Sequence, residues 1–203
     1  MMDGKRRMGV YNSDEKTEQP VQVVASGLEM LSGCSIIAAV NSIDTFEAAL
    51  TAPTRAIYLL TGNPLNLPQM LERARDHGKI CLVNIDFLDG LSRDRHAVEF
   101  LAVHKVAGIV STRFEVLKAA QGFGLFTVQR TFAIDSAAVT AAIKSMGQFL
   151  PDAMEVLPAM AAPKVAKRLH IGNPNLMIIG GGLIESVREI EDFLAAGVNS
   201  VSV

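Results

Sequence analysis

The feature of this chain that most constrains its fold is a regular alternation of short apolar segments with longer amphipathic ones. Eight apolar segments of strand length recur along the 203 residues, and neighbouring segments start 18 to 29 residues apart. The segments are rich in β-branched residues, and each intervening stretch is long enough for one helix. Apolar strands separated by helices predict parallel β-α units. The segments start at Ser35, Ala56, Lys79, Gly108, Phe126, Ala153, Leu176 and Ser200.

Start and stop signals in the intervening stretches support helices there. Ser92 is expected to cap the helix that follows it, a later helix is expected to begin at Asp135 or Ser136, and Gly197 is expected to end the last one. Seven helical stretches between eight strands predict an α/β fold, a compact (β/α)8 TIM-type barrel. A doubly wound open sheet is the alternative, but the repeat is uniform and no early strand-helix turn carries a GxGxxG motif. The eighth helix of the barrel is missing or lies outside the chain.

Composition divides the chain into two regions and limits its class. Residues 1–33 are polar and are expected to form a partly disordered tail, whereas residues 34–203 are expected to form the barrel domain. The formal net charge of −2 does not mark a nucleic-acid binder. Two cysteines in apolar surroundings, Cys34 and Cys81, indicate reduced thiols in the cytoplasm. No apolar run reaches the roughly 18 residues of a membrane helix, so no membrane partner is expected.

The carboxyl ends of the predicted strands form the functional face of such a barrel. That face is polar, but no histidine or lysine stands at a strand end. Asp86 and Glu155 have two interpretations: a general acid and base, or groups that orient a ligand and hold Arg113 and Arg130 in ion pairs. Two carboxylates without a third ligand are a weak indication of a metal, so no metal site and no catalytic residue is assigned. The candidate ligand-binding residues on this face are Asp86, Arg113, Gln129, Arg130, Glu155 and Ser202.

Three consecutive glycines, Gly180, Gly181 and Gly182, follow the seventh apolar segment and precede a helix start. In many barrels the loops after strands 7 and 8 hold a phosphate with backbone N–H groups and a helix N-terminus. A side chain on these residues would block that approach. The run therefore predicts a phosphate site, with the Ser202 hydroxyl as an added donor. The alternative is a crowded bend that closes the barrel.

Six longer stretches can be compared with known families: SIIAAVNSIDTFEAAL, LLTGNPLNLPQML, NIDFLDGLS, FTVQRTFAIDS, MEVLPAM and IIGGGLIES. Together they resemble the glycerol uptake operon antiterminator regulatory proteins over roughly Ser35 to Val203. The resemblance implies a compact barrel without catalytic activity. It also implies a cytoplasmic regulator that senses glycerol 3-phosphate, acts on leader mRNA and prevents transcription termination. Leader mRNA as a partner rests on this resemblance alone.

The resemblance can be carried over residue by residue. The positions that match the family's motifs are Asp86, Asp89, Gln129, Arg130, Gly181, Gly182 and Leu183. The chain departs from the motifs at three positions. Asn84 stands where histidine is frequent, Arg113 stands where lysine is common, and Ala159 replaces a glycine.

Other functions and partners stay open at the level of the sequence. An enzyme that acts on a phosphorylated three-carbon or sugar substrate is the main alternative, and a barrel that has lost its ligand and binds proteins is another. Beyond glycerol 3-phosphate as effector, no cofactor is expected. Without an eighth helix the outer face of the last strand would be bare and apolar, which favours a homodimer. The segment that begins at Val21 is the alternative cover for that face.

Overall fold

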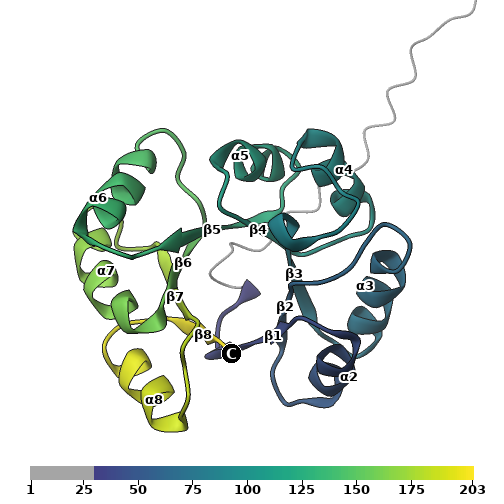
Figure 1. Ribbon diagram of the computed structural model, residues 1–203, viewed down its shortest axis with the longest axis horizontal. Coiled ribbons are helices and arrows are strands. Elements are labelled where there is room, and N and C mark those ends of the chain that lie inside the picture. The colour runs from purple at the N-terminus through teal and green to yellow at the C-terminus, as the bar shows by residue number, and fades with distance from the viewer. Residues whose placement is uncertain (1–29) are drawn as a thin grey trace, which may run out of the picture.

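The computed structural model describes residues 30–203, which form a closed barrel of eight parallel strands in sequential order (Figure 1). Strand β8 pairs with β1 and closes the barrel. This arrangement confirms the predicted TIM-type barrel, and each strand starts within one residue of its apolar segment. The strands are β1 (Ile36–Val40), β2 (Ala56–Leu59), β3 (Ile80–Asn84), β4 (Gly108–Ser111), β5 (Phe126–Phe132), β6 (Ala153–Leu157), β7 (Met177–Gly181) and β8 (Ser200–Ser202).

A helix follows each of the first seven strands, and the helices ring the barrel (Figure 1). Two 3-10 turns, η1 (Ile85–Phe87) and η2 (Ala159–Ala161), follow β3 and β6 directly. Within the described residues no helix follows β8. The helices are α2 (Ile43–Thr51), α3 (Leu67–Asp76), α4 (Arg95–Val103), α5 (Phe114–Gly122), α6 (Ser136–Ser145), α7 (Ala162–Leu169) and α8 (Val187–Ala195).

Two of the three predicted helix boundaries are confirmed. The Asp135 side chain caps α6 by accepting a hydrogen bond from the Ala138 N–H, 2.7 Å away. Gly197 follows α8 with φ +92°, a conformation that favours glycine. The prediction for α4 was wrong, because its cap is Asp94 rather than Ser92. Both residue types can cap a helix, and the Asp94 side chain does so by accepting a hydrogen bond from the Ala97 N–H at 3.0 Å.

The alternation of side chains along each strand separates two cores. One set of strand residues fills the barrel interior, including Ile37, Tyr58 and Val128. The opposite set packs against the surrounding helices. Leu31 and Cys34 are also part of the interior core. The core of the barrel domain therefore extends to Leu31, into the region that the sequence assigned to the tail. The rest of that tail, residues 1–29, lies outside the described residues.

The outer face of β1 and β8 lies between α2 and α8 and carries exposed apolar side chains (Figure 1). Ile36 is 40% exposed and Val203 is 47% exposed. A groove of ≈ 500 Å³ runs along this flank and is lined in part by Ala38 and Pro53. The amphipathic helix α8 has no buried residue. A homodimer that would cover this flank stays a prediction.

Candidate functional site

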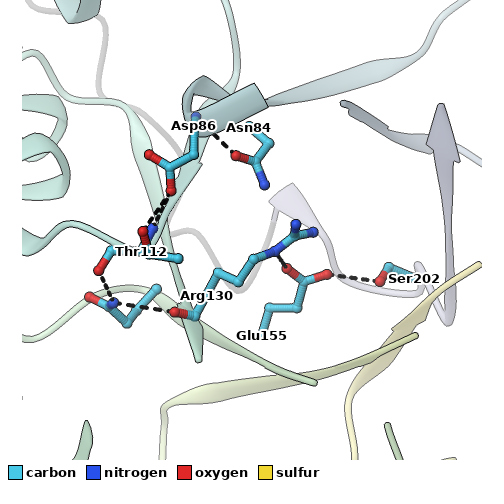
Figure 2. A network of polar contacts seen from close by, with 7 residues as sticks. Asn84, Asp86, Thr112, Arg130, Glu155 and Ser202 are labelled. Atoms are coloured by element: carbon cyan, nitrogen blue, oxygen red, sulfur yellow. Dashed lines mark hydrogen bonds and ion pairs between the residues drawn. The ribbon is translucent and has the colours of Figure 1, made fainter. Parts of the chain in front are cut away.

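Four polar side chains project inward at the carboxyl end of the barrel, and they lie together in Figure 2. They are Asn84 on β3, Arg130 on β5, Glu155 on β6 and Ser202 on β8, and all four are buried. Each follows an inward-facing residue of its strand by two positions, as Arg130 follows Val128. The period-two pattern of the strands therefore brings together polar residues that are far apart in the sequence.

Arg130 and Glu155 form a buried ion pair at the centre of this group. Arg130 Nε donates to Glu155 Oε2 at 2.6 Å, and the Ser202 hydroxyl donates to Glu155 Oε1 at 2.8 Å (Figure 2). Both carboxylate oxygens are thus engaged. The side chain of Glu155 is 0% exposed and that of Arg130 is 7% exposed. A charge buried to this degree needs a partner, and each of these residues supplies one for the other.

The rest of the Arg130 guanidinium faces the mouth of the barrel. Its Cζ lies 5.4 Å from the centroid of the Phe87 ring, which belongs to the turn after β3. Within the described chain, Nη1 and Nη2 have no hydrogen-bond acceptor. Arg130 is therefore held through Nε and by contact with Phe87, and it keeps donors free for a ligand.

Two other buried polar groups, Asn84 Nδ2 and the Tyr58 hydroxyl, have no hydrogen-bond partner within residues 30–203. The Asn84 side chain is fixed because its Oδ1 accepts from the Asp86 N–H at 3.0 Å, and its amide nitrogen points toward Arg130 in Figure 2. Unpaired buried donors are rare in folded proteins and mark places where a ligand or water completes the hydrogen bonding. Burial, reinforced by the Glu155 carboxylate, raises the pKa of Tyr58 well above its ordinary value, so the hydroxyl stays protonated.

The sequence reasoning missed Tyr58. A signal for it existed, because Tyr58 is the polar side chain within the apolar segment AIYLL and alternates with Ile57 and Leu59. The same reasoning named Asn84 but gave it no role beyond its departure from the family pattern.

Asp86 lies directly after β3, but its carboxylate is turned toward β4 rather than toward Arg113 or Arg130. Its carboxylate accepts three hydrogen bonds from the end of β4, at 2.9 Å from the Ser111 hydroxyl, 2.7 Å from the Thr112 N–H and 2.9 Å from the Thr112 hydroxyl. Gln129 donates to the Thr112 carbonyl at 3.1 Å. Asp86 and Gln129 therefore brace the ends of β3, β4 and β5. Arg113 is exposed and forms no ion pair with Asp86 in the described part of the chain.

The three glycines differ in what surrounds them. Gly180 faces outward, where a Cβ would lie 3.4 Å from the Ala159 side chain. A Cβ on Gly181 would lie 2.8 Å from Glu155 Oε1 and 2.6 Å from the Ser202 hydroxyl, so this glycine makes room for the buried carboxylate. Gly182 leaves the strand with φ +73°, and Leu183 follows with φ +57°.

The backbone after the glycines has free donors. Gly182 and Leu183 have positive φ in succession, and no acceptor for either N–H lies among the described residues. Positive φ is uncommon for leucine and is often found where the backbone serves a ligand. Successive amides in such a turn form an anion-binding concavity. The amides of Gly182 and Leu183 are therefore candidate donors for the phosphate that the glycine run predicts, and the phosphate site stays a prediction.

The N-terminus of α8 was expected to contribute to that phosphate site, and a capping box covers part of it. Glu189 Oε2 accepts from the N–H groups of Glu185 and Ser186, both at 2.9 Å. These N–H groups, Glu185's first, and the Ser186 hydroxyl lower the pKa of Glu189 below its ordinary value. The capping box thus satisfies the N–H groups of Glu185, Ser186 and Glu189, whereas those of Val187 and Arg188 have no acceptor among the described residues.

The described residues contain no group of three or more His, Cys, Asp or Glu side chains placed to hold a metal ion. None of the described helices is both long and apolar enough to cross a bilayer. The four histidines lie on helices or at their ends rather than on strands. His96 is in the first turn of α4, and the C-caps of α3, α4 and α7 are His77, His104 and His170.

Comparison with known proteins places this geometry in a family. The family model described as glycerol-3-phosphate responsive antiterminator matches residues 36–203. The chain belongs to this family. It is 30% identical over 178 residues to protein YgcP of Escherichia coli (strain K12), covering 86% of this chain and 91% of that protein.

Two solved structures of antiterminator proteins resemble the barrel. The first is a glycerol uptake operon antiterminator-related protein from Thermotoga maritima, with 31% identity, a TM-score of 0.76, and 83% of this chain and 94% of that chain covered. The second is the glycerol uptake operon antiterminator regulatory protein from Listeria monocytogenes, with 28% identity, a TM-score of 0.78 and coverage of 84% and 92%. The resemblance that the sequence motifs indicated is confirmed.

The antiterminator motifs divide into residues at the mouth and residues away from it. Of those that match, Arg130 and Gly181 lie at the polar centre, whereas Asp89 is exposed in the loop before α4. Of the three departures, Asn84 lies at the centre, Ala159 packs against Gly180, and Arg113 lies outside. Of the three departures, Asn84 is therefore the one that lies among the buried polar residues of the site.

Proposed function

We propose that the protein is a cytoplasmic regulator that binds glycerol 3-phosphate in the barrel mouth and then acts on leader mRNA to prevent transcription termination. One observation carries the proposal: among the described residues, donors without an acceptor gather at the carboxyl end of the barrel. Those of Arg130 and Asn84 lie together in Figure 2, the amides of Gly182 and Leu183 follow β7, and the unpaired Tyr58 hydroxyl feels the charges of Glu155 and Arg130. Membership of the antiterminator family supplies the regulatory role.

The two groups of donors suit the two ends of a short phosphorylated polyol. The amides of Gly182 and Leu183 bind the phosphate, and the donors of Arg130, Asn84 and Tyr58 bind the hydroxyl oxygens. The Glu155 carboxylate stands between these groups, because Oε1 lies next to Gly181 and Oε2 next to Arg130. A three-carbon ligand is short enough to reach from one group to the other.

The alternative, an enzyme that uses Asp86 and Glu155 as acid and base, has less support. Asp86 accepts three hydrogen bonds from β4, and both oxygens of Glu155 are engaged by Arg130 and Ser202. A general base needs a free oxygen within reach of the proton that it removes. These carboxylates therefore suit positioning better than proton transfer.

Titration calorimetry with glycerol 3-phosphate tests the ligand. We expect binding that weakens by about tenfold or more in Asn84→Leu, which removes a donor from the site, equivalent to about 1.4 kcal/mol. The matched control is Asn173→Leu in the loop before β7, which should bind as the wild type does. A wild-type protein that binds no glycerol 3-phosphate contradicts the proposal.

In vitro transcription through the leader of a glycerol-utilisation operon from the same genome tests the regulatory role. Full-length transcript should increase when protein and glycerol 3-phosphate are both present, and Asn84→Leu should need more ligand for the same effect. Incubation with triose phosphates tests the enzyme alternative: turnover lost in Glu155→Gln would replace the regulator with an enzyme.

A further inference from the structure

Charge is distributed unevenly over the helices of the barrel. Helices α6 and α7 contain no acidic residue, whereas each of the other five described helices contains at least one. The acidic groups of the loop and strand before them are engaged: Asp135 caps α6, and Glu155 is paired inside the barrel. The basic residues of the two helices are Lys144, Lys164, Lys167 and Arg168. A chain with a net charge of −2 thus carries one basic face.

The cations of this face are free to bind an anion. All four are exposed, and none forms an ion pair in the described part of the chain. Arg168 Nη2 donates to the Thr140 hydroxyl at 3.2 Å, which joins α7 to α6. A groove of ≈ 380 Å³ lies between the two helices and is lined by Ala133, Asp135, Ser136, Val139, Ala161, Lys164, Val165 and Arg168.

Exposed apolar side chains stand at the mouth end of the same groove. Phe132 is 50% exposed and Ile134 is 83% exposed in the segment from β5 to α6. Met160 is 61% exposed in η2, just before α7. Single-stranded nucleic acids are bound where basic side chains follow the backbone and aromatic side chains stack on the bases. Phe132 is such a side chain, and Ile134 and Met160 add apolar surface beside it. An acidic protein surface would need the cations but not an exposed aromatic ring.

We propose that the α6–α7 face, with Phe132, Ile134 and Met160 at its edge, is the surface on which single-stranded RNA docks. The inference rests on the proposed function and adds the location of the RNA. It also explains how binding of the effector inside the barrel can influence the RNA surface outside it. Arg130 is three residues before Ala133, and the Ala133 N–H donates to the Leu157 carbonyl at 2.8 Å. A ligand that holds Arg130 and Glu155 therefore fixes both segments that lead to the groove.

A charge-reversal experiment tests the surface. The triple variant Lys164→Glu, Lys167→Glu and Arg168→Glu is compared with a control that makes the same change of charge on other faces: Arg55→Glu, Lys118→Glu and Arg188→Glu. The probe is a fluorescent single-stranded RNA of random sequence, about 20 nucleotides long, titrated with protein in glycerol 3-phosphate at several salt concentrations. The slope of log K, where K is the association constant for RNA, against log salt concentration is negative. Loss of three phosphate contacts should make this slope shallower by about 2, since each contact contributes about 0.7 to its magnitude.

The expected result is a loss of RNA affinity of about tenfold or more in the α6–α7 variant and a change below about twofold in the control. Phe132→Ala should weaken binding by about fivefold or more without changing the salt slope, because it removes stacking but no charge. Calorimetry should give unchanged glycerol 3-phosphate binding in the triple variant, which shows that it is folded.

Three results would contradict the proposal that RNA docks on the α6–α7 face. The first is equal loss of affinity in the two triple variants, and the second is a wild-type protein that binds the effector but no RNA. The third is a combination of two observations: polyglutamate displaces the RNA, and Phe132→Ala binds the RNA as tightly as the wild type. That combination would point to an acidic protein partner. If the wild-type protein fails to bind glycerol 3-phosphate, the proposed function is wrong. The RNA titrations still test whether RNA docks on the α6–α7 face.

Discussion

Removing Arg130 should destabilise the barrel strongly, because Glu155 would be left charged and buried. The variant Arg130→Met keeps an unbranched apolar stem and removes the guanidinium, which lies 2.6 Å from a carboxylate that is 0% exposed. The Ser202 hydroxyl would then be the remaining partner of Glu155. Breaking a buried ion pair by removing one partner costs about 3–5 kcal/mol. At roughly 2–4 °C per kcal/mol for a chain of this size, the thermal midpoint should fall by about 6–20 °C.

A double-mutant cycle separates the ion pair from the loss of side-chain packing. Urea unfolding of Arg130→Met, Glu155→Gln and the double variant gives three free energies of unfolding. The double variant should lose at least about 2 kcal/mol less than the sum of the single variants, since it leaves no unpaired charge. A loss below about 1 kcal/mol in Arg130→Met, or strict additivity in the cycle, would refute the reasoning that the pair is buried and coupled.

Three other measurements follow from the structure. Gly181→Ala should lower the free energy of unfolding by about 1–3 kcal/mol and weaken glycerol 3-phosphate binding, because the new methyl group displaces the Glu155 carboxylate; unchanged unfolding and binding would contradict this. Burial raises the pKa of Cys81 from 9.0 to about 12 and also raises the pKa of Tyr58, so the folded protein keeps protons that the unfolded chain loses. The free energy of unfolding should therefore fall as the pH rises from about 9 toward 12. A free energy of unfolding that rises over that range would contradict this prediction. Sedimentation at micromolar concentration should give a dimer that Ile36→Asp dissociates, whereas a wild-type monomer that binds no hydrophobic dye would show that the β1–β8 flank is covered in another way.

The order and type of the elements could be read from the sequence because they depend on local patterns. Strands buried on both faces produce continuous apolar segments, and the eight segments predicted the strand starts to within one residue. The caps at Asp135 and Gly197 are also local, since each acts within one helical turn. The shift from Ser92 to Asp94 was not predictable in this way, because two good capping residues stood two positions apart and the local pattern does not choose between them.

The partners of the polar side chains were decided by the tertiary structure. The sequence placed Asp86, Arg130 and Glu155 at strand ends, but strand register pairs Arg130 with Glu155 and turns Asp86 toward β4. The Gly181 backbone makes room for the carboxylate of Glu155, which is 26 residues earlier in the chain. Local sequence patterns do not relate residues that far apart. Local periodicity determines which face of a strand a residue occupies. Which side chain it meets depends on the closure of the barrel. This closure brings β8 beside β1 and buries Tyr58, Asn84 and Glu155 inside the barrel.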